Sequence, residues 1–464
     1  MKHIIVHYCP KMFHNSPNDA CILGCTRTPL MRLKRKPPLS KPKPGRQPKP
    51  QYHKNFAGDM LEHVLIHSIH KSTQYEPDKA SLLLDSIEDI VVGNCNSTTM
   101  QVTARLAQAK AWKHLHKLNP KPNTKRSKTT HLSSLYSPGV MAINRQCSSG
   151  LQAFADVANS IVSRTIECGI AAGVESMSVD RLDLVGIPSG IDSRREMAEK
   201  NNKVFEDIST PMGVTSEIVA KAHFVTRREL DEFAAESHRK AALARASGKF
   251  KNETTLFPDD YFSSRNIPQV SQDDGIREGT SVESLSHLRP SFSKFGVTTA
   301  GNSSQLTDGA AAAVVASRAF ALSNNLPILA IYRGFACVGV HPRFMGIGPI
   351  YAIPRALEIA GITISDVDLF ELNEAFASQA IVCVRELGLD MKKVNVNGGA
   401  IALGHPLGCT GMRALTTVIS ELQRRGGGIG VVSMCVGTGM GAACVVEVLG
   451  ESNKKYNNII RSKL

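Results

Sequence analysis

Three residues set among small side chains carry the chemistry of this sequence. Cys147 lies in the run NRQCSSG (144–150), His405 in GHP (404–406) and Cys435 in CVGTG (435–439). A thiolate can attack a carbonyl carbon, an imidazole can take the proton of the thiol, and a second thiol can supply a proton. Together the three residues predict thiolate chemistry on a thioester.

Cys147 is the strongest candidate for the nucleophile. It follows an expected strand at 140–143 and precedes an apolar helix that begins near Gly150. The helix dipole and the free N–H groups of the first turn stabilise a thiolate at this position, which predicts a lowered thiol pKa. A buried structural cysteine is the common alternative for such a residue.

His405 and Asn373 are candidates for proton transfer and polarisation. The glycine- and alanine-rich run 397–408 lets backbone and ligand approach His405 closely, which suits a base or an oxyanion donor. The run lacks the lysine of a phosphate-binding glycine loop and a GxGxxG pattern, which disfavours a nucleotide site. Asn373 follows an expected strand at 369–372, and its amide either points into the site or caps the next helix.

Two distant segments repeat the same spacing. An arginine and a glycine follow Gly150 by 14 and 19 residues, and they follow Gly411 by the same distances. Each segment reads as helix, turn and buried strand, with a short strand upstream at 140–143 or 394–396. The repeat predicts two related halves, each with buried strands covered by helices. The stretch before the helix is 18 residues longer in the first half, which indicates an insertion.

The net charge of +14 is concentrated in two runs. Residues 32–54 hold nine basic side chains and 113–128 hold six, and neither run contains an acidic one. Both contain Pro/Lys stretches that are typical of loops, so we expect solvated insertions and no nucleic-acid partner. The 11 cysteines show no zinc-type spacing, which predicts reduced thiols and no metal site. The sequence contains no run of about 18 apolar residues, so it predicts no membrane span.

The last three residues match a peroxisomal import signal. Ser462, Lys463 and Leu464 form the tripeptide SKL, and the polar segment before it predicts an exposed tail. We therefore expect a peroxisome or a related organelle, with an import receptor as partner. A mitochondrial or cytosolic enzyme with an accidental tripeptide is the alternative.

Several of these motifs together resemble the thiolase family, and most of all its peroxisomal 3-ketoacyl-CoA branch. They are NRQCSSGLQA (144–153), NEAFA (373–377), NGGA (397–400), GHP (404–406) and CVGTGMG (435–441), joined by RTP (27–29), MG (212–213) and AGNSS (300–304). The resemblance covers nearly the whole chain.

The resemblance implies an α/β thiolase fold with two similar five-stranded α-β-α-β-α halves and a helical loop domain. The implied boundaries are a first half at 18–179, completed by 291–322 and carrying basic insertions near 32–54 and 113–134, a CoA-binding loop domain at 180–290, a second half at 323–450, and a tail at 451–464.

The resemblance also implies a role for each site residue. Cys147 takes the acyl group, His405 activates it and helps hold an oxyanion, and Cys435 gives and takes the substrate proton. Asn373 positions a water for the enolate oxygen, and the N–H groups of Cys147 and Gly437 form the other oxyanion hole.

The ligands and partners follow from the same resemblance. Ser304 and Met212 match positions that line the pantetheine channel, CoA is a co-substrate and not a permanent cofactor, and the chain forms a homodimer. The implied reaction is thiolytic cleavage of 3-ketoacyl-CoA in fatty-acid β-oxidation. Acetoacetyl-CoA synthesis by the same residues and a non-catalytic lipid-binding relative stay open as alternatives. The chain-length preference does not follow from the sequence.

Overall fold

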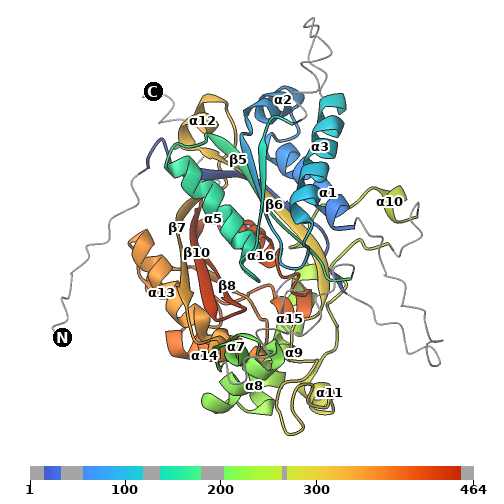
Figure 1. Ribbon diagram of the computed structural model, residues 1–464, viewed down its shortest axis with the longest axis vertical. Helices are drawn as coiled ribbons and strands as arrows, with labels where there is room; N and C mark the ends of the chain where they lie inside the picture. Colours follow the sequence, from blue (N-terminus) through green and yellow to red (C-terminus); the bar gives the residue numbers. More distant parts are fainter. Residues whose placement is uncertain (1–14, 33–55, 119–135, 179–202, 264–268, 451–464) are drawn as a thin grey trace, which may run out of the picture.

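The computed structural model describes residues 15–32, 56–118, 136–178, 203–263 and 269–450 (Figure 1). The tail at 451–464 and nearly all of the basic run at 32–54 lie outside these residues. Among the described residues, ten strands form one sheet, with the order β4-β3-β5-β6-β1-β7-β10-β9-β8 and with β2 beside β6.

The first five strands of this order form one half of the molecule. β4 and β5 lie parallel to β3, whereas β6 runs antiparallel to both β5 and β1. Alanine, valine and glycine fill these strands, and β1, β5 and β6 are buried along their whole length, as expected for a sheet covered on both faces. The bounds are β1 Ala20–Arg27, β2 Met31–Arg32, β3 Asp89–Gly93, β4 Gly139–Ile143, β5 Cys168–Ser176 and β6 Thr307–Ser317.

The second half repeats this pattern with four strands. They are β7 Ala330–Gly339, β8 Leu369–Leu372, β9 Gly428–Val436 and β10 Met440–Val448. β8 lies parallel to β9, and β10 runs antiparallel to β9 and β7.

The strand expected at 394–396 is reduced to a single bridge between Phe370 and Val394. The reason lies in Asn395, whose backbone has a φ of 44°. Its side-chain amide, and not its backbone, pairs with Leu372: it accepts the Leu372 N–H at 2.9 Å and donates to the Leu372 carbonyl at 2.8 Å.

Helices separate and cover the two halves in five layers. α1 (Phe56–Ser72) and α3 (Met100–Leu118) pack on the outer face of the first half, and α13 (Gly348–Ala360) and α14 (Ala377–Leu387) on the outer face of the second. Between them lie α5 (Ser149–Val162) and α16 (Thr410–Arg424), whose apolar side chains contact strands of both halves. These layers confirm the expected thiolase fold class.

Close packing of α5 against α16 depends on glycine. A Cβ on Gly150 would lie 2.5 Å from the carbonyl oxygen of Gly408, and a Cβ on Gly411 would lie 2.4 Å from the backbone nitrogen of Leu151. No side chain fits at either position, so the repeat marks the place where the halves meet. A short pairing of Cys21 and Ile22 in β1 with β7 also joins the two halves of the sheet.

The segment between the halves is helical. Its helices are α7 Lys203–Ile208, α8 Met212–Ala222, α9 Arg227–Ala246, α10 Asp259–Ser263 and α11 Val282–Ser286. α9 begins with a capping box, in which Thr226 and Glu229 bond each other's backbone N–H groups. The remaining elements are α2 Pro77–Ser86, α12 Arg318–Ser323, η1 Pro342–Ile347, η2 Ile364–Asp366 and α15 Ala400–Leu403.

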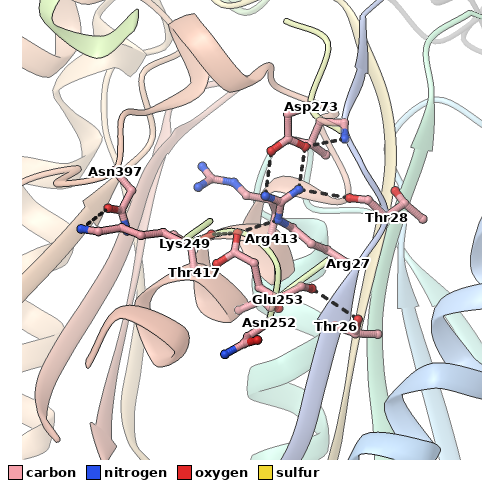
Figure 2. Close-up of polar contacts among 12 residues, drawn as sticks. Thr26, Arg27, Thr28, Lys249, Asn252, Glu253, Asp273, Asn397, Arg413 and Thr417 are labelled. Atoms are coloured by element: carbon pink, nitrogen blue, oxygen red, sulfur yellow. Dashed lines mark hydrogen bonds and ion pairs between the residues drawn. The ribbon is translucent and has the colours of Figure 1, made fainter. Parts of the chain in front are cut away.

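A buried ionic cluster ties this helical segment to the first strand (Figure 2). The guanidinium of Arg27 donates to both carboxylate oxygens of Asp273, at 2.7 and 2.8 Å, and to Glu253 at 2.8 Å. Arg27 and Glu253 are fully buried. Because buried charges lose hydration, removing one partner of such a cluster is strongly destabilising. The cluster therefore fixes the segments around 253 and 273 against β1.

One charge prediction is wrong in part. Lys113 and Lys117 lie in the last turns of α3, whereas the sequence predicted a loop from residue 113. The described part of α3 runs to Leu118, and Asn119-Pro120 lies outside the described residues. Within the residues described, no helix is both long and apolar enough to cross a bilayer.

Candidate active site

Cys147 lies in a tight turn between β4 and α5. Gln146 has a φ of 48°, and its N–H donates to the Asn144 side chain at 2.8 Å. The Ser149 hydroxyl closes the turn, since it accepts the Arg145 N–H at 2.9 Å and donates to the Gln146 carbonyl at 2.6 Å. The turn directs the Cys147 sulfur at the backbone N–H of Gly437, which belongs to the other half.

The acidity expected for Cys147 is not what the structure shows. Burial raises the pKa of its thiol to about 11, and the charge of Glu175 adds to this, although the Gly437 N–H and the Cys147 N–H lower it. Desolvation of a thiolate therefore outweighs the donors at the helix start. Cys147 is therefore a thiol at neutral pH, and a base would have to remove its proton before it could act as a nucleophile.

A pH-dependent reactivity follows from this raised pKa. The rate of Cys147 alkylation by iodoacetamide should rise about tenfold per pH unit between pH 7 and 10, because only the thiolate reacts. Peptide mass mapping of timed samples measures the modified fraction at this residue. A rate that levels off below pH 8 would show a preformed thiolate and contradict the assignment.

His405 lies between an amide and a hydroxyl, in the turn before α16. Its Nε2 is 3.4 Å from the Nδ2 of Asn373, and its Nδ1 is 2.6 Å from the Thr410 hydroxyl. That hydroxyl lies 3.0 Å from the Pro406 carbonyl, which can only accept. Thr410 therefore donates to Pro406 and accepts from His405, which places the ring proton on Nδ1. The lone pair on Nε2 faces the site.

The surroundings of His405 favour its neutral form. Burial lowers the pKa of the imidazole to about 3, and the charge of Arg413 lowers it further. Arg413 itself pairs with the buried carboxylate of Glu371 at 2.8 Å. His405 is thus neutral at pH 7 with a lone pair on Nε2, although the lowered pKa makes it a weaker base than a free imidazole.

Cys435 lies near the end of β9 in an apolar wall. It packs with Met345 and Ala375, and the partly buried Met212 and Phe376 lie against this group. Burial, followed by the charge of Cys147, raises the pKa of the Cys435 thiol far above its usual range. The Cys435 thiol is therefore protonated at neutral pH.

The structure brings the predicted site residues together. Cys147 and Gly437 are joined by the N–H bond, and Asn373 and His405 by their side chains. The Asn373 N–H donates to Ser433 in β9 at 2.9 Å, two residues before Cys435. Met212 packs beside Cys435, and the Ser304 N–H donates to Ala375 at 3.0 Å. Asn373 does not cap α14, whose N-cap residue is Phe376.

Two residues next to the site were missed from the sequence. Thr410 orients His405, and Gln379 donates from its side chain to the Asn373 carbonyl at 2.8 Å. The repeat held a signal for Thr410, because it precedes Gly411 as Ser149 precedes Gly150. Across the described part of the chain, no three or more His, Cys, Asp or Glu side chains are arranged to hold a metal ion.

Comparison with known proteins places this chain in a family. The N-terminal thiolase domain matches residues 121–319 and the C-terminal thiolase domain matches residues 326–448. The chain belongs to the thiolase family.

Relatives in this family cover most of the chain. The peroxisomal 3-ketoacyl-CoA thiolase A of Mus musculus is 52% identical over 313 residues, which are 66% of this chain and 72% of the relative. The peroxisomal 3-ketoacyl-CoA thiolase 2 of Arabidopsis thaliana is 41% identical over 441 residues, 93% of this chain and 84% of the relative.

Solved structures agree with the fold. The dimeric peroxisomal thiolase of Saccharomyces cerevisiae superposes with a TM-score of 0.75 at 37% identity and covers 94% of this chain and 98% of its own. Human mitochondrial 3-ketoacyl-CoA thiolase in complex with CoA gives a TM-score of 0.71 at 29% identity, covering 93% of this chain and 98% of its own.

Proposed function

We propose that this protein is a 3-ketoacyl-CoA thiolase, an acyltransferase that cleaves 3-ketoacyl-CoA with CoA into acetyl-CoA and an acyl-CoA two carbons shorter. The observation that carries the proposal is the meeting of a partly buried thiol, Cys147, and a fully buried one, Cys435, with a neutral imidazole that is hydrogen-bonded to an amide. Relatives at 41–54% identity that carry this name support it.

The first half-reaction breaks the carbon–carbon bond. Nε2 of His405 takes the Cys147 proton, and the sulfur attacks the 3-keto carbon, whose oxyanion is held by the N–H groups of Cys147 and Gly437. The C2–C3 bond then breaks, and its electron pair forms the enolate of acetyl-CoA. Protonated His405 and a water held by Asn373 stabilise the enolate oxygen, and Cys435 protonates C2.

The second half-reaction restores the enzyme. The Cys435 thiolate takes the proton of an incoming CoA thiol, and the CoA sulfur attacks the acyl group on Cys147. The tetrahedral intermediate collapses with Cys147 as the leaving group, and His405 returns the proton to it. Each thiol thus ends the cycle as it began.

CoA binding is proposed for the face between the helical segment and the core. Met212 packs against the group that contains Cys435, and Ser304 bonds Ala375 of the same group, which supports a pantetheine channel on this side of the site. A small cavity beside Ser304 is lined by His238, Arg277, Thr280, Leu285, Ala300, Gly301, Gln305 and Ile401. Arg277 offers a cation for the phosphates of CoA.

A homodimer is part of the proposal. β4 ends the strand order of the sheet. Next to it the structure exposes a group of apolar side chains: Val102 by 63%, Leu106 by 55% and Met141 by 41%. Such a group favours burial against a second copy, and the solved yeast relative is described as dimeric. Sedimentation equilibrium tests the association, and a monomer at micromolar concentration would oppose it.

A spectrophotometric thiolysis assay tests the activity directly. Purified protein, CoA and either acetoacetyl-CoA or a long-chain 3-ketoacyl-CoA should show loss of the substrate and formation of acetyl-CoA. Turnover of both substrates supports a degradative thiolase, and turnover of acetoacetyl-CoA alone supports the biosynthetic alternative. Binding without turnover by fully folded protein would support the non-catalytic alternative.

The orientation of His405 by Thr410 predicts a mutant effect. Thr410→Val keeps the shape of the side chain but removes the acceptor for Nδ1–H, so kcat should fall about ten- to hundredfold. Thr410→Ser keeps the acceptor and should retain most of the activity. Steady-state thiolysis with both variants measures the difference, and equal loss in the two would assign Thr410 to packing.

We also propose that the enzyme reaches peroxisomes through Ser462, Lys463 and Leu464. Peroxisomal relatives support the compartment, while the tail itself lies outside the described residues. Deletion of Leu464 should move an N-terminally tagged protein from peroxisomal puncta to the cytosol, because the import receptor reads the complete tripeptide. Fluorescence colocalisation measures this, with the full-length tagged chain as control. Unchanged puncta would place the signal elsewhere.

A further inference from the structure

Gln305 lies between the helical segment and the turn that carries His405. Its side-chain nitrogen donates toward three carbonyls, those of Gly275 at 2.9 Å, Ile401 at 3.0 Å and Ala402 at 3.2 Å. Because Nε2 faces only acceptors, the orientation of this amide is settled by its surroundings.

The main chain of the same residue holds the other end of the turn. The Gln305 carbonyl accepts the His405 N–H at 3.3 Å and the Thr307 hydroxyl at 2.7 Å. Gly404 lies between the two attachments with a φ of 108°, and a Cβ there would lie 2.2 Å from the Thr307 hydroxyl oxygen. The backbone of this turn is therefore tightly packed at Gly404, and its position depends on the contacts of Gln305.

The side-chain bonds satisfy groups that a helix leaves open. α15 is one turn long, so the carbonyls of Ile401 and Ala402 lie at its C-terminal end, where intrahelical donors run out. Gln305 supplies the donor, and it fixes the direction in which the chain leaves α15 toward His405.

The opposite side of Gln305 is anchored to the buried ionic cluster. Asp273, bound by Arg27 in Figure 2, also accepts the Leu30 N–H at 2.8 Å. Gly275 follows two residues later, and a Cβ there would lie 2.7 Å from the Ala402 carbonyl. The helical segment, Gln305 and α15 are thus packed in direct contact.

We propose that Gln305 is a positioning residue for His405: its carboxamide clamps the end of α15 to the Gly275 segment and so sets where Nε2 meets the substrate. This rests on the proposed role of His405 as the base. Gln305 holds the backbone around the ring and does not contact the ring itself, so its loss displaces the base without changing its chemistry.

The test compares Gln305→Leu and Gln305→Glu with the wild type. Leucine keeps much of the volume and removes the donors, whereas glutamate keeps the shape and turns an acceptor toward three carbonyls. Both should lower kcat about ten- to hundredfold, as expected for a misplaced catalytic group. The KM for CoA should stay within about twofold, because the Gln305 side-chain nitrogen is turned toward protein carbonyls although the residue also lines the cavity beside Ser304. Gln152→Leu is the matched control, since that side chain bonds only Asp156 in α5, at 2.6 Å, among the contacts described.

A second measurement does not depend on turnover. Histidine-selective ¹⁵N NMR should show the Nδ1–H signal of His405, assigned by its loss in His405→Ala, shifted or exchange-broadened in both Gln305 variants and unchanged in Gln152→Leu. If the wild type fails to cleave 3-ketoacyl-CoA, the proposed function fails while this signal still decides the role of Gln305.

Three results would overturn the proposal. The first is a raised KM for CoA with unchanged kcat, which would make Gln305 a substrate contact. The second is wild-type kcat in both variants, and the third is an unshifted NMR signal of His405. Should one variant not fold, the other gives the same decision.

Discussion

Replacing Cys147 by alanine should abolish thiolysis, with kcat reduced on the order of 10⁴-fold or more. The acyl group has to be carried covalently between the two half-reactions, and alanine offers no atom that can carry it. Steady-state kinetics with acetoacetyl-CoA and CoA measure the loss. The fold should persist, because the substitution removes one sulfur from a turn that is held by the Ser149 and Asn144 side chains.

A neighbouring thiol provides the matched control for this prediction. Cys95 is also buried, and its sulfur lies 3.3 Å from the Gln146 side chain. Cys95→Ala should therefore keep most of the activity. In wild-type protein incubated with substrate but no CoA, peptide mass mapping should find the acyl mass on Cys147. An acyl group on Cys435 instead would reverse the two roles.

The second large effect is expected for Cys435→Ser. Serine is nearly the same size, but its hydroxyl is a much weaker acid, so protonation of C2 and deprotonation of CoA should both slow. We expect kcat to fall about 10²–10⁴-fold with little change in the KM for substrate. A solvent-deuterium effect on kcat that grows in the variant would support proton transfer as the slow step.

Cys444→Ser is the control for Cys435→Ser. Cys444 is fully buried in β10, the strand paired with β9, and lies outside the site. Cys444→Ser also places a hydroxyl in a buried position, but Cys444 has no proposed role in proton transfer. Equal losses in the two variants, or a raised KM with unchanged kcat in Cys435→Ser, would make Cys435 a packing residue.

Much of the fold was accessible from the sequence because glycine spacing and apolar strands are local signals. The matched runs after Gly150 and Gly411 predicted α5, α16 and the strands that follow them. The strand predicted at 394–396 is not formed, because the side-chain amide of Asn395 takes the place of backbone pairing with Leu372. Strand propensity does not reveal a side-chain contact of this kind. The end of α3 was placed too early because lysines are compatible with both helix and loop.

The site residues were found by motif, but their environments were not. Local reasoning assigned Cys147 a lowered pKa, whereas burial by elements from both halves raises it. Thr410 and Gln305 act through contacts with His405 that the three-dimensional arrangement creates, and Gln305 bridges residues about 30 and 100 positions away in the chain. The domain boundaries and the roles of the individual residues stay predictions.

The packing of the two halves against each other has a consequence for fragments of this chain. The proposed nucleophile, Cys147, comes from one half, whereas the proposed base, the amide of Asn373 and the second thiol come from the other, and the halves pack closely where α5 meets α16 at two glycines. Neither half alone contains the full set of proposed site residues. A fragment of the chain that holds only one half should therefore lack thiolysis activity.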